Sequence, residues 1–126
     1  MQAWLLVALG GALGSVLRYQ AGALVLHQAG STQFPYGTFT VNVAGCLIAG
    51  LLAGLGEHFG FLSAPVRLFL FTGFLGGFTT FSAFGVETIG LVERGEWAIA
   101  AIYVLASVIC GLGALWAALK LGGIGA

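Results

Sequence analysis

Neutral polar side chains recur at helical spacing inside strongly apolar stretches of the chain. Thr38 precedes Asn42 by four residues, and Tyr103 is separated from the next polar residue, Ser107, by the same interval. Each pair would therefore share one face of a helix. A third polar group consists of Thr79, Thr80 and Ser82. All these side chains can donate hydrogen bonds and none is an obligatory anion, so the row predicts a site for an anion that loses its hydration water. Taken singly, Asn42 is also typical of a hydrogen bond between helices.

Two phenylalanines are a second candidate for the lining of an anion site. Phe81 and Phe84 are three residues apart and would also share a helix face. A phenyl ring has a positive edge, so rings presented edge-on can face an anion. The alternative for this pair is packing in the core or against lipid.

Arg18 and Glu87 are the ionisable side chains that lie deepest in the apolar stretches. A charge inside a membrane costs about 2.5–3.5 kcal/mol on insertion scales, so each needs a partner or a water-filled vestibule. Arg18 lies toward the end of its stretch, where it could snorkel or concentrate anions at a pore mouth. We expect a structural or vestibule role for these charges rather than direct coordination of an ion.

The most informative segment is residues 73–84, which read GFLGGFTTFSAF. Glycine costs about 1 kcal/mol relative to alanine inside a helix, so Gly73, Gly76 and Gly77 together favour a break. An unwound turn frees carbonyl oxygens, and these can coordinate a hard cation. The alternative is a helix kinked for packing, in which Thr and Ser hydroxyls bond back to carbonyls of their own helix.

The composition shows what must position these residues. Of the 126 residues, 60% are apolar and 6% are charged, whereas a soluble domain carries about 25% charged residues. A soluble globular protein and an intrinsically disordered chain are therefore excluded. The formal net charge is zero, so electrostatics predicts no nucleic-acid partner.

The lengths of the apolar stretches predict a single all-α membrane domain over residues 1–126. A bilayer core of about 30 Å needs about 20 helical residues. By this rule four spans are expected, at residues 2–26, 37–55, 65–91 and 97–120, and the third contains the predicted break.

The distribution of Lys and Arg does not predict which face of this helix bundle would lie in the cytoplasm. Arg67 and Lys120 lie toward the face that holds the N-terminus, and Arg18 and Arg94 lie toward the other face. Cytoplasmic loops normally carry the excess of Lys and Arg. Either a weaker signal fixes one orientation, or the protein inserts both ways and pairs with an inverted copy of itself.

Glycines at four-residue spacing favour close helix packing, which would also suit self-association. The pairs are Gly10 with Gly14 and Gly50 with Gly54, and Ser107 precedes Gly111 by the same interval. Small residues at this spacing let helix backbones approach closely in lipid.

The chain resembles the Fluc-type (CrcB) fluoride channels over nearly its whole length. The resemblance rests on GTFTVN at the start of the second span and GFLGGFTTFSAF in the third, together with Arg18 in GSVLRY and the later Glu87. It implies an antiparallel, dual-topology homodimer in the cell (inner or plasma) membrane that passes fluoride passively through two pores. It also implies a central sodium ion, held by backbone carbonyls at the positions of Gly76 and Thr79.

The resemblance also assigns pathway residues. Asn42, Phe81 and Phe84 match the fluoride pathway of the family, and Tyr103 and Ser107 resemble its lining from the fourth helix. The hydroxyls of Thr38, Thr80 and Ser82 would complete the polar lining. The chain departs from the family at Ala83, where threonine is common, and at Phe78, where leucine is common. The first departure removes a hydroxyl near the predicted pore.

Other functions fit the residues less well. A small four-helix drug exporter needs a carboxylate in its first span, and residues 2–26 contain none. No nucleophile, base and orienting acid can be assembled for an enzyme. The composition is also compatible with a non-transporting subunit of a larger assembly. The residue types alone do not distinguish a fluoride channel from a chloride channel.

Overall fold

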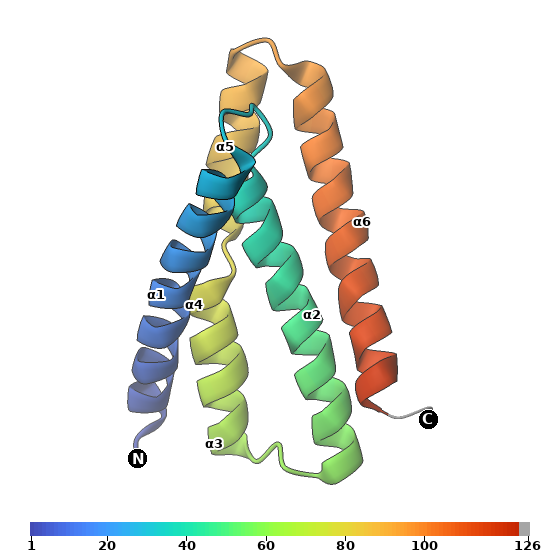
Figure 1. Ribbon diagram of the computed structural model, residues 1–126. Helices are drawn as coiled ribbons and strands as arrows, with labels where there is room; N and C mark the ends of the chain where they lie inside the picture. Colours follow the sequence, from blue (N-terminus) through green and yellow to red (C-terminus); the bar gives the residue numbers. More distant parts are fainter. Residues whose placement is uncertain (124–126) are drawn as a thin grey trace.

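The computed structural model describes residues 1–123, so the last three residues of the predicted domain lie outside the described part. Every regular element within residues 1–123 is a helix, as expected for the all-α class. In chain order the elements are α1 (Ala3–Ala29), α2 (Tyr36–Phe59), α3 (Ala64–Arg67), η1 (Leu68–Leu75), α4 (Gly76–Phe78), α5 (Phe81–Glu93) and α6 (Trp97–Gly122) (Figure 1). The segment η1 is π-helical and connects α3 to α4 without a loop, so residues 64–78 form one helical run.

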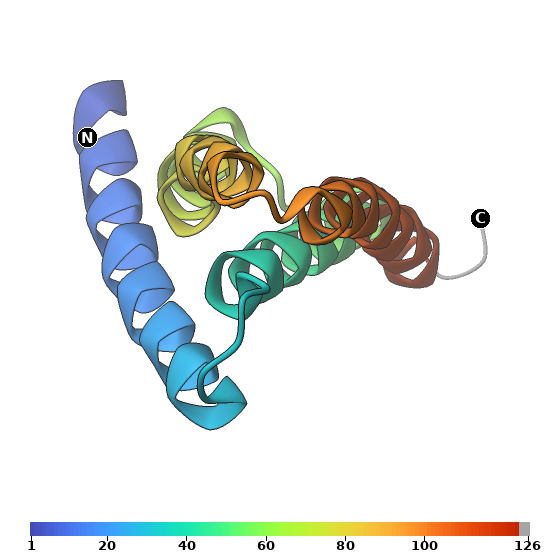
Figure 2. The ribbon, with the colours of Figure 1, turned by 90° about the horizontal axis from the view of Figure 1, so that it is seen from above.

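The long helices alternate in direction. The loops α1–α2 and α5–α6 lie at one end of the molecule, and the N-terminus and the α2–α3 loop lie at the other (Figure 1). Seen from above, α1 and α6 are at opposite edges, with α2 and the α3–α5 segment between them (Figure 2). The most extensive packing is between α2 and α6 and between α1 and η1. This arrangement brings α2, α5 and α6 together around the residues discussed below.

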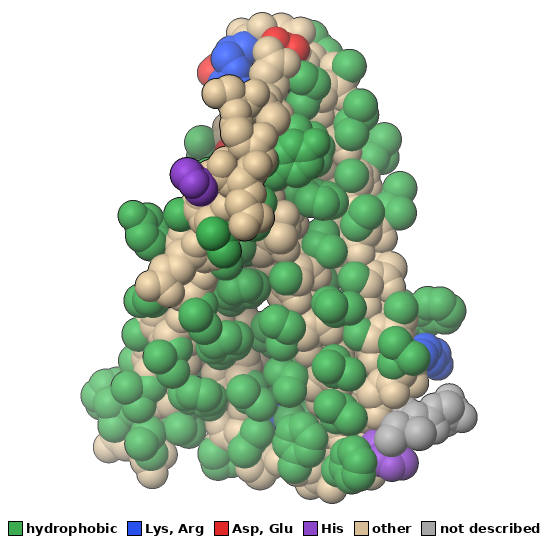
Figure 3. Space-filling model, in the orientation of Figure 1, with side chains coloured by type: hydrophobic (Ala, Val, Ile, Leu, Met, Phe, Trp, Pro, Cys, Tyr) green, Lys and Arg blue, Asp and Glu red, His purple; other side chains and the backbone are tan. Residues whose placement is uncertain are grey.

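Within residues 1–123, three helical segments are long and apolar enough to cross a membrane. They are Tyr36–Phe59, Ala64–Glu93 and Trp97–Gly122, and they contain the predicted spans 37–55, 65–91 and 97–120. On the face shown in Figure 3, charged side chains lie toward the two ends of the molecule, and hydrophobic side chains cover the band between them. Such a distribution suits a hydrocarbon environment.

The predicted first span corresponds to α1, which does not reach the hydropathy of the other three segments. At 27 residues α1 is longer than a bilayer core requires. Its second half, however, contains Arg18, Gln20 and Gln28, which lower the mean hydropathy of any 18-residue window through it. The count of four spans therefore stays a prediction.

The interruption of the third long segment follows the glycines rather than falling on them. Gly73, Gly76 and Gly77 are all helical, whereas Thr79 and Thr80 have extended backbone, with φ/ψ of −89°/156° and −147°/116°. The glycines are needed for another purpose. A Cβ on Gly73 would lie 3.0 Å from the carbonyl oxygen of Val7, and one on Gly77 would lie 2.5 Å from that of Gly11. They let this segment pack closely against α1.

The glycine pairs predicted from spacing make the same kind of contact within the chain. A Cβ on Gly10 or Gly14 would collide with the η1 carbonyl oxygens of Phe69 and Phe74 respectively. On α2, Gly50 and Gly54 are seated in the same way against backbone carbonyls of α6. The predicted close approach of helices is confirmed, and these contacts hold one chain together.

A side chain at Gly50 should therefore destabilise the fold. In Gly50→Ala the new Cβ meets the backbone carbonyl of Leu115, which can move only with α6. Overpacking of this kind costs about 1–3 kcal/mol. The matched control is Gly113→Ala, because a Cβ on Gly113 has no neighbour within 4 Å. Thermal unfolding in detergent should show a lower melting temperature for Gly50→Ala alone; equal melting temperatures would mean that this contact is not tight.

Candidate functional site

Asn42 joins α2 to the interruption by two hydrogen bonds. The amide of Thr80 donates to Asn42 Oδ1 over 2.8 Å, and Asn42 Nδ2 donates to the carbonyl oxygen of Thr80 over 3.0 Å. In an uninterrupted helix the Thr80 amide would donate to the carbonyl of Gly76. Asn42 therefore supports the extended backbone directly, and it keeps one further Nδ2 hydrogen for another acceptor.

Thr80 begins α5 by capping it. Its hydroxyl oxygen accepts a 3.1 Å hydrogen bond from the amide of Ala83 and lies 3.4 Å from Ser82 Oγ. Side-chain oxygens of Ser and Thr commonly satisfy free amides at a helix start. In an uninterrupted helix the Ala83 amide would instead donate to the carbonyl of Thr79. Because of this cap, the carbonyl of Thr79 has no helical donor, as the carbonyl of Gly76 has none.

The backbone carbonyls of Gly76 and Thr79 both lose their helical donors to side chains: the amide of Thr80 donates to Asn42, and the amide of Ala83 donates to the hydroxyl of Thr80. Gly76 and Thr79 line a surface pocket of about 250 Å³ between the α4 region and α2. Its other lining residues are Gly45, Cys46, Ala49, Phe71, Leu75 and Leu115. Neutral backbone oxygens that have lost their donors suit a hard monovalent cation, so the atoms here fit the ligand set expected at these positions. The hydroxyl of Thr79 bonds back to the carbonyl of Leu75 over 2.9 Å, as the kinked-helix alternative predicts for hydroxyls.

Glu87 receives two hydrogen bonds from two other helices. Thr38 Oγ1 donates to its Oε1 over 2.6 Å, and Tyr103 Oη donates to its Oε2 over 2.7 Å. Tyr103 is completely buried, at 0% exposure. Two neutral hydroxyls therefore stabilise the Glu87 carboxylate by hydrogen bonding, and they are the partners that an ionisable group inside a membrane needs. The hydroxyl hydrogens of Thr38 and Tyr103 are used in these bonds.

The aromatic residues lie in two different surroundings. The Phe84 ring is 5.0 Å from that of Tyr103 and 5.7 Å from that of Phe81, centroid to centroid. Phe84 is half-buried in this cluster, whereas Phe81 is 84% exposed. Phe34, from the α1–α2 loop, packs edge-on against Tyr103 with centroids 5.4 Å apart. The sequence pattern singled out Phe81 and Phe84 and missed Phe34, which lies outside any helical repeat.

Among the predicted hydroxyl donors, Ser107 stands apart in the described part of the chain. Its Oγ is buried and has no hydrogen-bond partner among the described residues. It lies one helical turn beyond Tyr103 on α6. Buried polar atoms are normally satisfied, so a hydroxyl without a protein partner calls for another partner, such as a water molecule or an ion.

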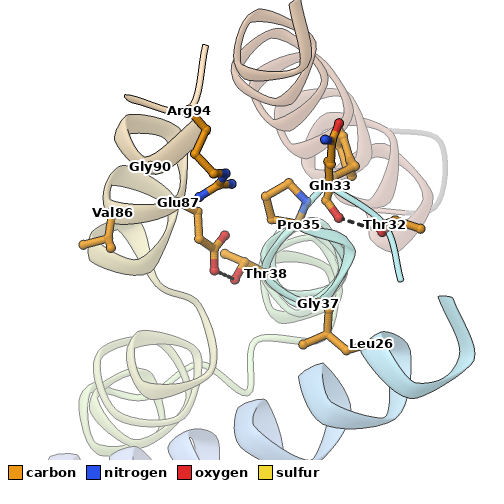
Figure 4. Close-up of a pocket in the computed structure, with 11 residues that line it drawn as sticks. Leu26, Thr32, Gln33, Pro35, Gly37, Thr38, Val86, Glu87, Gly90 and Arg94 are labelled. Carbon is orange, nitrogen blue, oxygen red and sulfur yellow. Dashed lines mark hydrogen bonds between the residues drawn. The ribbon is translucent and has the colours of Figure 1, made fainter. Parts of the chain in front are cut away.

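Two pockets open beside Glu87 at the end of the molecule that holds the α1–α2 loop. The larger, of about 420 Å³, is lined by Leu26, Thr32, Gln33, Phe34, Pro35, Gly37, Thr38, Val86, Glu87, Gly90 and Arg94 (Figure 4). In Figure 4, Glu87 and Arg94 project from α5 toward Thr38 and the loop. A second pocket of about 310 Å³ brings Arg18 and Ala83 to the same Glu87.

Gln33 and Arg94 are pocket residues that no sequence pattern indicated. Gln33 Nε2 donates to Glu96 Oε1 over 2.7 Å, which ties the α1–α2 loop to the start of α6. Both pocket residues lie outside the apolar spans, where periodicity carries no information about contacts. The structure thus places Asn42, Thr80 and Ser82 at the interruption, and Thr38, Phe84, Glu87 and Tyr103 in one cluster. Their role in binding an ion stays a prediction.

Comparison with known proteins covers almost the whole chain. The family model of CrcB-like protein, Camphor Resistance (CrcB), matches residues 5–119. The chain is 50% identical over 117 residues to the fluoride-specific ion channel FluC of Methylobacillus flagellatus, covering 93% of this chain and 91% of that protein. It is 53% identical over 119 residues to the protein of the same name from Paracoccus denitrificans, covering 94% and 93%. The corresponding Agrobacterium fabrum protein is 47% identical over 117 residues, 93% of each chain.

Proposed function

The chain belongs to the CrcB-like protein family, and on this premise we propose that it is a fluoride channel. It passes fluoride passively across the cell (inner or plasma) membrane and so lowers fluoride in the cytoplasm. The structural observation that carries the proposal is the buried hydroxyl of Ser107, which has no hydrogen-bond partner among residues 1–123 and lies one helical turn from Tyr103, whose ring packs against Phe84. A buried hydroxyl that has no partner within residues 1–123 suits a small anion that exchanges water for protein groups.

The proposed pathway uses the donors that the fold leaves available. Ser107 Oγ and the second Nδ2 hydrogen of Asn42 donate to the ion, and the edges of Phe81 and Phe84 face it between these donors. Thr38 and Tyr103 donate to Glu87 and so stabilise its carboxylate away from water, which leaves their hydroxyls unavailable to the ion. Thr80 and Ser82 hold the start of α5, from which both phenylalanines project.

The proposal includes a second copy of the chain, inverted in the membrane. Two chains related in this way would bring their pockets at Gly76 and Thr79 together and enclose two pores. One carbonyl from each of these residues in each chain would then surround a structural sodium ion. The support is the loss of helical donors at both carbonyls and their position in a pocket at the surface. A bound cation lowers the cost of an anion in the same low-dielectric region.

Fluoride efflux from proteoliposomes tests the function. Purified protein is reconstituted into vesicles loaded with potassium fluoride, valinomycin is added, and released fluoride is read with an electrode. We expect rapid fluoride release, and no chloride release from vesicles loaded with potassium chloride. Release of neither ion would overturn the channel in favour of a non-transporting subunit, and equal release would overturn the selectivity.

The inverted pairing predicts dependence on the balance of cations. Adding two or three lysines to the α2–α3 loop should fix one orientation, because positively charged loops stay in the cytoplasm. Such a variant should lose efflux when produced alone and regain it when co-produced with a variant biased the other way. The same number of glutamines in this loop is the control and should leave efflux unchanged. Sided cysteine labelling of the otherwise unaltered chain should reach the loop from both faces; labelling from one face only would exclude the inverted pair.

A further inference from the structure

Arg18 makes a hydrogen bond to the backbone immediately before the interruption. Its Nε donates to the carbonyl oxygen of Gly77 over 3.0 Å, which joins α1 to the last turn of the helical run 64–78. In an uninterrupted helix the amide of Phe81 would donate to this carbonyl, and the extended backbone at Thr79 and Thr80 prevents it. Arg18 thus supplies the missing donor. Its positive charge also lies at the carbonyl end of a helix, where a cation is favourable.

Three successive turns of α1 hold Gly77. A Cβ on Gly77 would lie 2.5 Å from the carbonyl oxygen of Gly11 and 3.0 Å from Ser15 Oγ, and Arg18 bonds its carbonyl. The first two contacts fix the position of the Gly77 backbone. The bond from Arg18 fixes the direction in which its carbonyl points.

The opposite side of the interruption is held by α2. Asn42 bonds both the amide and the carbonyl of Thr80. The proposed cation ligands, the carbonyls of Gly76 and Thr79, are each one residue away from a backbone group that is fixed in this way. Because neighbouring peptide planes share a Cα, the direction of the Gly77 carbonyl restricts that of Gly76.

We propose that Arg18 is a positioning residue for the cation site, and that it acts through the Nε–Gly77 hydrogen bond rather than through its charge on permeating anions. This inference rests on the proposed function for the identity of the cation. Loss of the bond lets the Gly77 peptide rotate, so the Gly76 carbonyl spends less time in the orientation that binds sodium. The measurable consequence is weaker sodium binding.

Two substitutions separate the hydrogen bond from the charge. Arg18→Gln removes the charge and keeps an N–H donor on the atom that corresponds to Nε, at the same number of bonds from Cα. In Arg18→Met the side chain is as long as that of glutamine but has no charge and no hydrogen-bond donor. Lys120→Gln removes one positive charge from an exposed residue in the last turn of α6, and it controls for net charge.

The first readout is thermal unfolding of the purified protein, with sodium titrated against a bulky organic cation at constant ionic strength. Stabilisation by a bound ion grows with the logarithm of its concentration above the dissociation constant. We expect Arg18→Gln and Lys120→Gln to follow the unaltered protein, and Arg18→Met to need at least about tenfold more sodium, the usual scale for one lost hydrogen bond to a charged group. The second readout, the sodium concentration for half-maximal fluoride efflux, should shift in the same order.

The outcomes are decisive in either direction. Equal sodium dependence in Arg18→Gln and Arg18→Met, whether shifted or not, overturns the inference, because the donor then has no separate effect. If Arg18→Met yields no folded protein, Arg18→Lys replaces it: lysine keeps the charge but places its donors one bond farther out. Weaker sodium stabilisation in Arg18→Lys than in Arg18→Gln supports the hydrogen bond, and the reverse order overturns it. The thermal readout needs no transport, so absence of fluoride efflux overturns the proposed function alone.

Discussion

Replacing Phe84 by isoleucine should lower fluoride efflux by about tenfold or more while the protein stays folded. Isoleucine keeps much of the bulk in the cluster with Tyr103 but has no ring with a positive edge. If the ring edge contributes about 1.4 kcal/mol to an anion at the barrier, its loss slows passage about tenfold. Phe81→Ile should have an effect of the same sign. The measurement is the initial rate of electrode-detected efflux at matched protein density.

The controls for this prediction separate pore lining from folding. Phe59→Ile changes an exposed phenylalanine at the end of α2 and should leave efflux unchanged. Asn42→Ala should also reduce efflux, but it removes both bonds to Thr80 and so loosens the interruption as well. Size-exclusion elution should therefore match that of the unaltered protein before rates are compared. Unchanged efflux in Phe81→Ile, Phe84→Ile and Asn42→Ala would remove these residues from the pathway.

The sequence predicted the helices well because apolar length and periodicity are local properties. The segments at 37–55, 65–91 and 97–120 needed only the width of a bilayer and the rise of a helix. Shared helix faces were also predictable. Thr38 bonds to Glu87 of α5, and Asn42 bonds to Thr80, the residue that caps the same helix.

The partners of the polar side chains could not be predicted in this way. The sequence does not show which donors already have a partner within the protein. In the structure Thr38 and Tyr103 donate to Glu87, and Asn42 uses its Oδ1 and one Nδ2 hydrogen to bond Thr80. Each hydroxyl has a single hydrogen, so a partner that lies 16 or 49 residues away in the chain decides whether it is available. Only the fold shows that Ser107 Oγ remains without a partner in the described part of the chain.

The position of the interruption differs from the expectation for a related reason. Helix propensity placed it at the glycines, since glycine is the least favourable residue there except proline. In a membrane the same residues are also the means of close helix packing, and contact with α1 keeps Gly73 and Gly77 helical. The extended backbone instead begins at Thr79. There Asn42 accepts from the displaced amide of Thr80 and donates to the Thr80 carbonyl, and the hydroxyl of Thr80 accepts from the displaced amide of Ala83.

Removal of sodium should abolish most of the fluoride efflux. With sodium exchanged for a bulky organic cation on both sides, long enough to empty a slow site, the carbonyls of Gly76 and Thr79 would face one another across the dimer without a cation. At this depth water is scarce, and carbonyls without partners are costly. We expect efflux to fall at least about tenfold, the change produced by 1.4 kcal/mol, and to recover when sodium is restored. Full activity after verified removal of sodium would mean that the interruption is a kink without an ion site.

Gly76→Val tests the same site from the protein side. Gly76 is helical, with φ −61° and ψ −36°, and a Cβ there would meet only the carbonyl oxygen of Phe71, at 3.6 Å. One chain therefore has room for a side chain at this position, and its helix tolerates one. The crowding would arise where the second copy and the cation lie, so Gly76→Val should fold yet lose both sodium-dependent stabilisation and efflux. Thr79→Ser, which keeps the backbone ligand and the hydroxyl bonded to Leu75, is the matched control and should keep both. Normal sodium stabilisation in Gly76→Val would place the cation elsewhere, because a valine at the centre of the proposed cage leaves no room for an ion and its ligands.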